Sequence, residues 1–228
     1  MRPLRSLRLN KEQVRLSDDN NKPANRRPLT SRSTPWAKAL ASALVRAHVT
    51  PNAISVISIV FAAVGAWLLS SVKTPAGLIG AALCIQLRLL CNLLDGMVAI
   101  EGKQQSPTGA LFNEIPDRIA DSLFIVALGF AIGAVWLGWL GALAAAVTAY
   151  IRVLGGAIGL PQDFRGPLAK QQRMAVLTGA CVLGAIELWL HPTQWALLVA
   201  AWLIAVGSIV TCITRTLAIA RLLHAKAA

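Results

Sequence analysis

Charged residues are scarce in this 228-residue chain, where they make up 14% of positions. A soluble domain carries about 25%. Asp and Glu are especially few, at 10 against 22 Lys and Arg. Together with 56% apolar residues and a mean hydropathy of +0.60, this shortage of charge excludes an ordinary soluble globular domain. It indicates an integral membrane protein.

Cysteine is also rare, and the spacing of the four cysteines excludes a disulfide framework. No two of them form a CxxC pair, and each lies alone within an apolar run: Cys84, Cys91, Cys181 and Cys212. Cysteines in such positions serve as small hydrophobic residues. We therefore expect four reduced thiols that pack among apolar helices.

Residues 1–35 differ in composition from the rest of the chain. They hold nine of the 22 Lys and Arg and lack the apolar stretch of a signal peptide. We expect a disordered basic arm whose partner is an anionic membrane surface, where each cation adds about 1 kcal/mol. No aromatic residues are interspersed among these charges, so nucleic acid is not the expected partner. Residues 36–228 then form the membrane domain, with a short cytoplasmic tail.

Long apolar stretches predict an all-α integral membrane fold. About 20 apolar residues cross a bilayer, and six stretches suit this role: residues 52–72, 75–100, 109–133, 135–159, 174–190 and 193–221. Before the first of them, Trp36, Leu40 and Leu44 share one helical face. This pattern predicts a short amphipathic helix that lies at the membrane interface and precedes six transmembrane helices.

Loop charges predict the orientation of these helices. Cations gather in the basic arm, in residues 101–108 and 160–173, and after Arg215, whereas the alternate loops are nearly free of them. Positively charged loops stay cytoplasmic. Both termini should therefore be cytoplasmic, as an even number of spans requires.

Half of the acids, five of 10, lie within residues 92–121. One face of the second span carries Arg88, Asn92, Asp95 and Ala99. One face of the third span carries Gly109, Asn113, Asp117 and Asp121. Because a short loop joins these two spans, we expect the two faces to meet near the cytoplasmic boundary.

Acidic groups at such depth are costly and by default functional. Hard oxygen ligands suit Mg²⁺ or Mn²⁺, so the predicted metal ligands are Asn92, Asp95, Asn113, Asp117 and Asp121. Two other interpretations remain open. The acids can form structural ion pairs, Asp117 with Arg118 and Asp95 with Arg88. They can also line the cation pathway of an ion-coupled transporter.

The same residues resemble the signature of the CDP-alcohol phosphatidyltransferases, D-x-x-D-G-x-x-A-R-x8-G-x3-D-x3-D. Every spacing matches in this chain, which reads Asn92-x-x-Asp95-Gly96-x-x-Ala99-Ile100-x8-Gly109-x3-Asn113-x3-Asp117. Arg152 and the segment "GPLAKQQR" at 166–173 are also similar to the family. Three positions depart from it, because Asn92 and Asn113 replace the first and third aspartates and Ile100 replaces the arginine.

The resemblance implies a bacterial inner-membrane enzyme of phospholipid biosynthesis, assembled as a homodimer. Such an enzyme moves a phosphatidyl group from CDP-diacylglycerol to an alcohol and releases CMP. It implies that Asp95 is a metal ligand and that Asp117 is both a ligand and the general base, with Asp121 as the rival base. Neutral amides at 92 and 113 weaken metal binding, so a degenerate member that binds nucleotide lipid with little turnover also remains open.

The resemblance also suggests roles for three small residues and four cations. Asp95 and the three small residues Gly96, Ala99 and Gly109 would bind the nucleotide, because a residue with little or no side chain lets it approach the backbone. Four cations on the same side of the membrane suit phosphate groups of the donor or of a phosphorylated acceptor: Arg118, Arg152, Lys170 and Arg173. The identity of the acceptor alcohol stays open.

Overall fold

The computed structural model describes residues 34–104, 107–191 and 193–227, and within these ranges it contains helices and no strand. Most of the predicted basic arm, residues 1–33, lies outside the described residues. The helices are α2 (Pro35–Arg46), α3 (Pro51–Ser71), α4 (Pro75–Glu101), α5 (Gly109–Ala131), α6 (Val135–Ala157), α7 (Lys170–Leu190) and α8 (Trp195–Ala227). The predicted all-α integral membrane fold is confirmed, and α2 is the helix expected before the first span.

A Thr-Pro pair begins each of the first three helices. Proline suits the first helical position because its fixed φ is already helical and its missing N–H would have had no partner there. At α3 and α4 the hydroxyl of the preceding threonine also caps the helix. Thr50 accepts from Ala53 N at 3.3 Å, and Thr74 accepts from Gly77 N at 3.1 Å.

Two other local devices set helix boundaries. Gly133 and Gly159 follow the ends of α5 and α6 with φ of 71° and 79°, a left-handed backbone that glycine adopts without strain. At the start of α8 the carboxylate of Glu187 accepts hydrogen bonds from the N–H groups of Trp195 and Ala196, at 2.8 and 3.0 Å. An acid at a helix N-terminus is favoured by the helix dipole.

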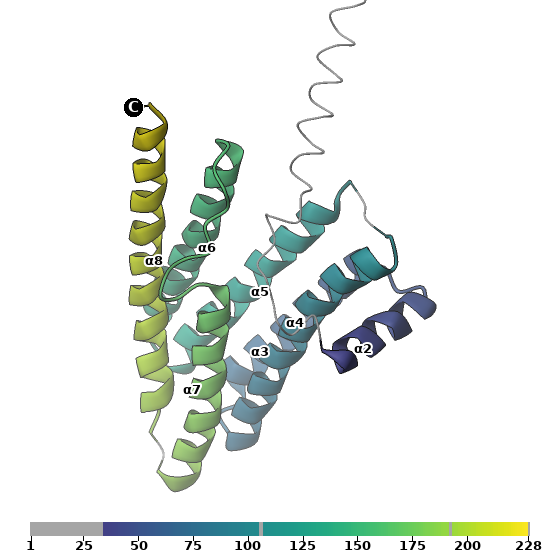
Figure 1. Ribbon diagram of the computed structural model, residues 1–228. Helices are drawn as coiled ribbons and strands as arrows, with labels where there is room; N and C mark the ends of the chain where they lie inside the picture. Colours follow the sequence, from purple (N-terminus) through teal and green to yellow (C-terminus); the bar gives the residue numbers. More distant parts are fainter. Residues whose placement is uncertain (1–33, 105–106, 192, 228) are drawn as a thin grey trace, which may run out of the picture.

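The helices form a bundle in which α3 packs against α4 and α5, α6 packs against α8, and α4 packs against α7. Figure 1 shows α6 and α8 side by side, and α2 next to α4 at the edge of the bundle away from α8. The core between the long helices is built from small and branched side chains around Phe124, which is fully buried. A second apolar cluster joins α2 to α4 through Ala37, Ala41 and Val98.

Close backbone approach brings α5 and α6 together. A Cβ added at Gly129 would lie 2.7 Å from the Cα of Gly138, and one added at Gly138 would lie 2.9 Å from the Cα of Gly129. No larger residue fits at either position without moving a backbone. Small residues at such crossings let membrane helices pack closely, and here they fix how α5 faces the rest of the bundle.

Many large apolar side chains face outward from the long helices, among them Val60 on α3, Leu83 on α4, Leu143 on α6 and Leu183 on α7. In the described part of the chain, five helices are long and apolar enough to cross a membrane: α3, α4, α6, α7 and α8. The third predicted span, α5, differs because it carries Glu114, Asp117, Arg118 and Asp121. Its length is similar, but it holds more charged residues than any of the other five long helices.

Two helix boundaries differ from the sequence prediction. Helix α7 begins at Lys170, four residues before the predicted start of the fifth span at 174, and α8 continues to Ala227. Loop residues were expected at 170–173 because two cations lie there. Both cations have acidic partners inside the bundle, so the first turn of α7 can enter it.

Candidate active site

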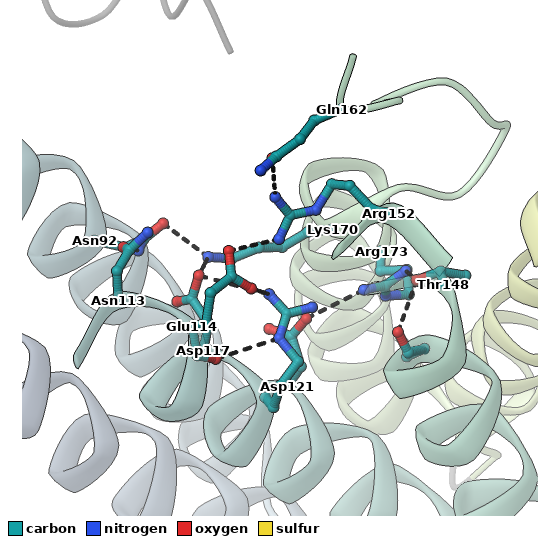
Figure 2. A network of polar contacts seen from close by, with 12 residues as sticks. Asn92, Asn113, Glu114, Asp117, Asp121, Thr148, Arg152, Gln162, Lys170 and Arg173 are labelled. Atoms are coloured by element: carbon teal, nitrogen blue, oxygen red, sulfur yellow. Dashed lines mark hydrogen bonds and ion pairs between the residues drawn. The ribbon is translucent and has the colours of Figure 1, made fainter. Parts of the chain in front are cut away.

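The predicted site lies between α4, α5 and α7, but α4 and α5 have few direct contacts with each other. Helix α4 packs mainly on α3 and α7, whereas α5 packs mainly on α3 and α6. Polar side chains bridge the two helices instead. We call these side chains, together with Asp95 on α4, the polar network: Arg88, Asn92, Asp95, Asn113, Glu114, Asp117, Arg118, Asp121, Arg152, Lys170 and Arg173. Figure 2 labels Asn92, Asn113, Glu114, Asp117, Asp121, Arg152, Lys170 and Arg173.

Arg88 is the central cation of the polar network. Its side chain is fully buried, and its Nη2 lies 2.9 Å from Asp117 Oδ1 and 3.0 Å from Asp121 Oδ1. The same nitrogen also donates to the backbone oxygen of Asp117 at 3.2 Å. The interpretation that paired Arg88 with Asp95 is wrong, because the Arg88 side chain points to the acids of α5.

Lys170, in the first turn of α7, joins two of the predicted metal ligands. Its Nζ donates to Asn92 Oδ1 at 2.7 Å and also contacts Asp117 Oδ2. Asn92 in turn donates to Asn113 Oδ1 at 3.5 Å. Figure 2 shows the Lys170 ammonium between the Asn92 amide and the Asp117 carboxylate. The predicted meeting of the two asparagines and Asp117 is thus present, with a lysine in its middle.

Asp95 stands apart from these cations. It is buried, and its Oδ2 accepts a hydrogen bond of 2.8 Å from Ser55 on α3. A buried carboxylate needs such a partner because an unpaired charge in the bundle is costly. Sequence reasoning missed Ser55, since a single serine in an apolar span carries no signal of its own.

Asp121, the rival base, is held between two arginines. Arg173 Nη2 lies 3.2 Å from Asp121 Oδ2, opposite Arg88 on Oδ1. The Arg173 side chain is itself buried and donates to the backbone oxygen of Leu168 at 2.8 Å and to Thr148 Oγ1 at 3.4 Å. Asp121 is therefore enclosed by protein groups, whereas Asp117 lies closer to the asparagines.

Arg152 extends the polar network toward the 158–169 loop, and Arg118 contacts two acids of its own helix. Arg152 Nη2 lies 2.5 Å from Glu114 Oε1 and its Nη1 donates to Gln162 Oε1 at 2.6 Å. Its guanidinium also lies 5.4 Å from the centre of the Phe164 ring, a cation–π contact. Arg118 reaches Glu114 at 3.5 Å and Asp117 at 3.8 Å.

A further buried arginine secures the 158–169 loop against the bundle. Arg215 on α8 donates to Thr148 O at 2.7 Å and to Arg165 O at 2.8 Å. Partial burial raises the pKa of the nearby Asp163 carboxyl, but hydrogen bonds from Arg165 outweigh it and hold that pKa below its ordinary value. The sequence placed Arg215 at the start of a charged tail, and its position within an apolar run was the signal of a buried role.

The structure places the three predicted small residues beside the polar network. Gly96 and Ala99 lie, partly buried, on the last turns of α4, and Gly109 is the first residue of α5. These helix ends flank Asp95 and Asn113. The arrangement leaves backbone rather than long side chains at both edges of the predicted nucleotide site.

An apolar groove of about 540 Å³ runs along the outer face of α5. It starts at Arg118, the residue that it shares with the polar network, and continues past Ser122 and Ala127. Its other end is lined by Trp67, Phe130 and Trp139. The groove is therefore an apolar surface that leads from the charged site toward the opposite end of the bundle.

The donor atoms of the site suit a divalent cation only when the amides take part. Among the residues that the structure describes, no three His, Cys, Asp or Glu side chains gather as a metal site. Asp95 and Asp117, supplemented by the amide oxygens of Asn92 and Asn113, form a set of hard oxygen atoms that fits Mg²⁺ or Mn²⁺. Asp121 contributes less readily because arginines contact both of its oxygens.

Cations outnumber acids in the polar network. It contains four carboxylates (Asp95, Glu114, Asp117 and Asp121) and five cations (Arg88, Arg118, Arg152, Lys170 and Arg173), and the three carboxylates of α5 pair with these cations. The interpretation of the acids as structural ion pairs is right for Asp117 with Arg118, at 3.8 Å. Five cations for four acids nevertheless leave positive charge for an anionic ligand such as a phosphate.

Comparison with known proteins identifies the family of this chain. A sequence model of the CDP-alcohol phosphatidyltransferase family matches residues 48–222. The phosphatidylinositol phosphate synthase of Mycolicibacterium smegmatis is 30% identical over 192 residues, which are 80% of this chain and 83% of that protein.

Solved structures show the same fold. The Mycobacterium tuberculosis phosphatidylinositol phosphate synthase with CDP-DAG bound superposes with a TM-score of 0.70 at 23% identity, covering 82% of this chain and 94% of that one. The same enzyme in complex with manganese and citrate gives a TM-score of 0.70 at 24% identity, over 80% and 88% of the two chains. The family match extends from before α3 into α8 and includes the whole polar network. This chain belongs to the CDP-alcohol phosphatidyltransferase family.

Proposed function

We propose that this chain transfers a phosphatidyl group from CDP-diacylglycerol to an alcohol acceptor and releases CMP. The observation that carries the proposal is the position of Asp95 and Asp117 beside an excess of cations, in a segment whose spacing matches the family signature. Family membership favours this reaction over the ion-coupled transporter. The family is divalent-metal dependent, and a structural relative is described in complex with manganese.

The chemistry divides among the residues of the polar network. The acceptor hydroxyl attacks the β-phosphorus of the donor, the bond from that phosphorus to the bridging oxygen breaks, and CMP leaves with that oxygen. A bound Mg²⁺ or Mn²⁺ supplies Lewis-acid stabilisation of the pyrophosphate charge. Asp117 takes the hydroxyl proton, as a general base does. Asp95 and the amide oxygens of Asn92 and Asn113 hold the metal with Asp117.

Asp117 suits the base better than Asp121. Two arginines with buried side chains, Arg88 and Arg173, hold both oxygens of Asp121, which leaves little access for a substrate hydroxyl. Arg88 also holds Oδ1 of Asp117, but the cations at its Oδ2, Lys170 and Arg118, are partly exposed. Asp117 lies beside Asn92 through Lys170, in agreement with the signature register that makes it the fourth acidic position. Asp121 then positions the two arginines.

The cations toward the 158–169 loop point to a phosphorylated acceptor. Arg152, Lys170 and Arg118 face the same acids, and arginine binds phosphate through two parallel hydrogen bonds. Arg173 supports this surface from within the bundle. The relatives named above are phosphatidylinositol phosphate synthases, so an inositol phosphate is the acceptor we would test first.

The groove along α5 suits the acyl chains of the donor lipid. It lies at the depth of the membrane-spanning helices, has an apolar lining, and begins at Arg118 beside the polar network. A diacyl lipid whose pyrophosphate lies at Asp95 and Asp117 can therefore extend its chains toward Trp67 and Trp139. In this arrangement Gly96, Ala99 and Gly109 border the nucleotide.

Membrane placement completes the proposal. We infer that α5 also crosses the membrane and brings the number of spans to six. We further infer that both termini face the cytoplasm, and that the protein resides in a bacterial inner membrane as a homodimer. The basic loops on one side support the orientation. Size-exclusion chromatography with light scattering in detergent checks the dimer.

CMP release tests the reaction directly. Purified protein in detergent is given CDP-diacylglycerol, Mg²⁺ or Mn²⁺, and a panel of acceptors that includes inositol phosphate, glycerol 3-phosphate, inositol and serine. We expect metal-dependent CMP release that Asp117→Asn lowers by about 100-fold or more. Glu101→Gln, which changes an exposed acid at the end of α4, is the matched control and should retain activity.

The same assay separates the transferase from a degenerate member. The two asparagines and the ion pairs of Asp117 favour slow turnover as the second candidate. Binding of CDP-diacylglycerol without CMP release for any acceptor would support that candidate. Neither binding nor release would contradict both.

A further inference from the structure

Lys170 differs from the other cations of the polar network because it contacts two predicted metal ligands at once. Its Nζ lies 2.7 Å from Asn92 Oδ1 and contacts Asp117 Oδ2. In the family signature, position 92 is the first metal-binding acid and position 117 the fourth. A single ammonium thus bridges the two oxygen atoms that the metal would have to bind.

The remaining oxygen atoms of the acids on α5 are also engaged. Arg88 contacts Oδ1 of Asp117 and Oδ1 of Asp121, and Arg173 contacts Oδ2 of Asp121. Both arginines have almost fully buried side chains, so they cannot easily withdraw. Lys170 has a flexible four-carbon stem without a planar guanidinium, and it is partly exposed, which makes it the cation that can leave.

The amide of Asn92 suits a lysine partner better than a divalent metal. An amide oxygen is neutral, so it accepts a hydrogen bond from an ammonium while adding no negative charge for a divalent ion. With aspartate at 92 and 113 the site would hold two further negative charges. Their absence lowers the attraction for Mg²⁺ or Mn²⁺, while the ammonium supplies one positive charge of its own.

We propose that Lys170 is a built-in cation of this site, bridging Asn92 and Asp117, and that a divalent metal binds by displacing it. The proposal rests on the metal site assigned under the proposed function. Lys170 thereby sets how tightly the chain holds its metal. After displacement, the freed ammonium stays beside the site, where it can contact an anionic ligand.

Manganese binding without any substrate tests this proposal. Mn²⁺ is titrated into detergent-solubilised full-length protein, and free Mn²⁺ is followed by electron paramagnetic resonance. We expect Lys170→Met to tighten Mn²⁺ binding by about tenfold or more, the scale on which groups around a metal tune its affinity. Asn92→Asp combined with Lys170→Met should bind most tightly. Arg165→Met, which removes an exposed cation of the 158–169 loop, should leave the affinity unchanged.

Unchanged or weaker Mn²⁺ binding by Lys170→Met would overturn the proposal. A second measurement uses the unaltered chain, in case that variant does not fold. Acetylation of Lys170 by an amine-reactive reagent, followed by mass spectrometry, should rise with Mn²⁺ occupancy because the metal frees the ammonium. A Lys170 reactivity that does not change with Mn²⁺ would contradict displacement.

These readouts are independent of CMP release. If the chain releases no CMP but Lys170→Met binds Mn²⁺ more tightly, the transfer reaction fails and the role of Lys170 stands. If CMP is released but Lys170→Met binds Mn²⁺ no more tightly, the reaction stands and the role of Lys170 fails.

Discussion

The Arg88 guanidinium on α4 lies 2.9 Å from the Asp117 carboxylate on α5. Because these two helices make few other contacts, this ion pair is a principal link between them. Arg88 also reaches Asp121 at 3.0 Å, so one buried cation aligns two acids of the site. The orientation of Asp117 depends on a residue that the family signature does not contain.

Replacement of Arg88 should destabilise the protein strongly. Arg88→Met leaves Asp117 and Asp121 buried with one cation fewer, and breaking a buried ion pair costs about 3–5 kcal/mol. Thermal or chemical unfolding in a mild detergent measures this loss. Arg165→Met, at an exposed ion pair, is the control and should change stability little. Equal stability of the two variants would contradict the central role of Arg88.

Removal of the Ser55 hydroxyl should weaken metal binding at Asp95. Ser55→Ala deletes the 2.8 Å hydrogen bond that orients this carboxylate, and loss of such a supporting contact weakens metal affinity by about tenfold. The Mn²⁺ concentration for half-maximal CMP release should rise accordingly. Ser58→Ala, on the same helix with its hydroxyl bonded to Ser55 O, should behave like the parent chain.

Arg152 should affect the acceptor more than the donor. Arg152→Gln removes the guanidinium beside Glu114 and Gln162, and we expect the KM for a phosphorylated acceptor to rise by about tenfold. The KM for CDP-diacylglycerol should change much less. Steady-state kinetics with each substrate varied in turn makes the comparison. A larger change for the donor would assign Arg152 to the pyrophosphate instead.

Filling the groove along α5 should impair use of a long-chain donor. Ala127→Trp places a large ring in the groove lined by Trp67 and Phe130, so the KM for long-chain CDP-diacylglycerol should rise severalfold. A short-chain donor should be affected less, because its chains end before the obstruction. Leu183→Trp, on the outward face of α7, is the control. An equal effect on both donors would show that the chains lie elsewhere.

The orientation of the bundle can be measured with single cysteines. In a Cys212→Ser background the other three described cysteines are buried, so Glu101→Cys and Lys73→Cys report opposite ends. We expect Glu101→Cys to be labelled only from the cytoplasmic side by a membrane-impermeant maleimide, and Lys73→Cys only from the other side. The reverse pattern would invert the proposed topology.

The sequence predicted the fold well, but it did not predict which side chains pair within the candidate site. Asp117 and the two asparagines do come together, as their helical spacing indicated. The partner of Arg88 was predicted wrongly, and Ser55 was missed. Lys170 was expected in a loop and lies in a helix, because Asp117 neutralises it there.

By itself, the sequence determined the local properties: long apolar helices, their Thr-Pro starts, and the faces on which the acids of α4 and α5 lie. These follow from hydropathy and from the 3.6-residue helical period, which act within one segment. Only the tertiary structure decided that Lys170 bridges Asn92 and Asp117. Contacts between helices depend on how packed surfaces set their separation and rotation, as the close approach of Gly129 and Gly138 does for α5 and α6. That information is distributed over the whole bundle, so no single motif contains it.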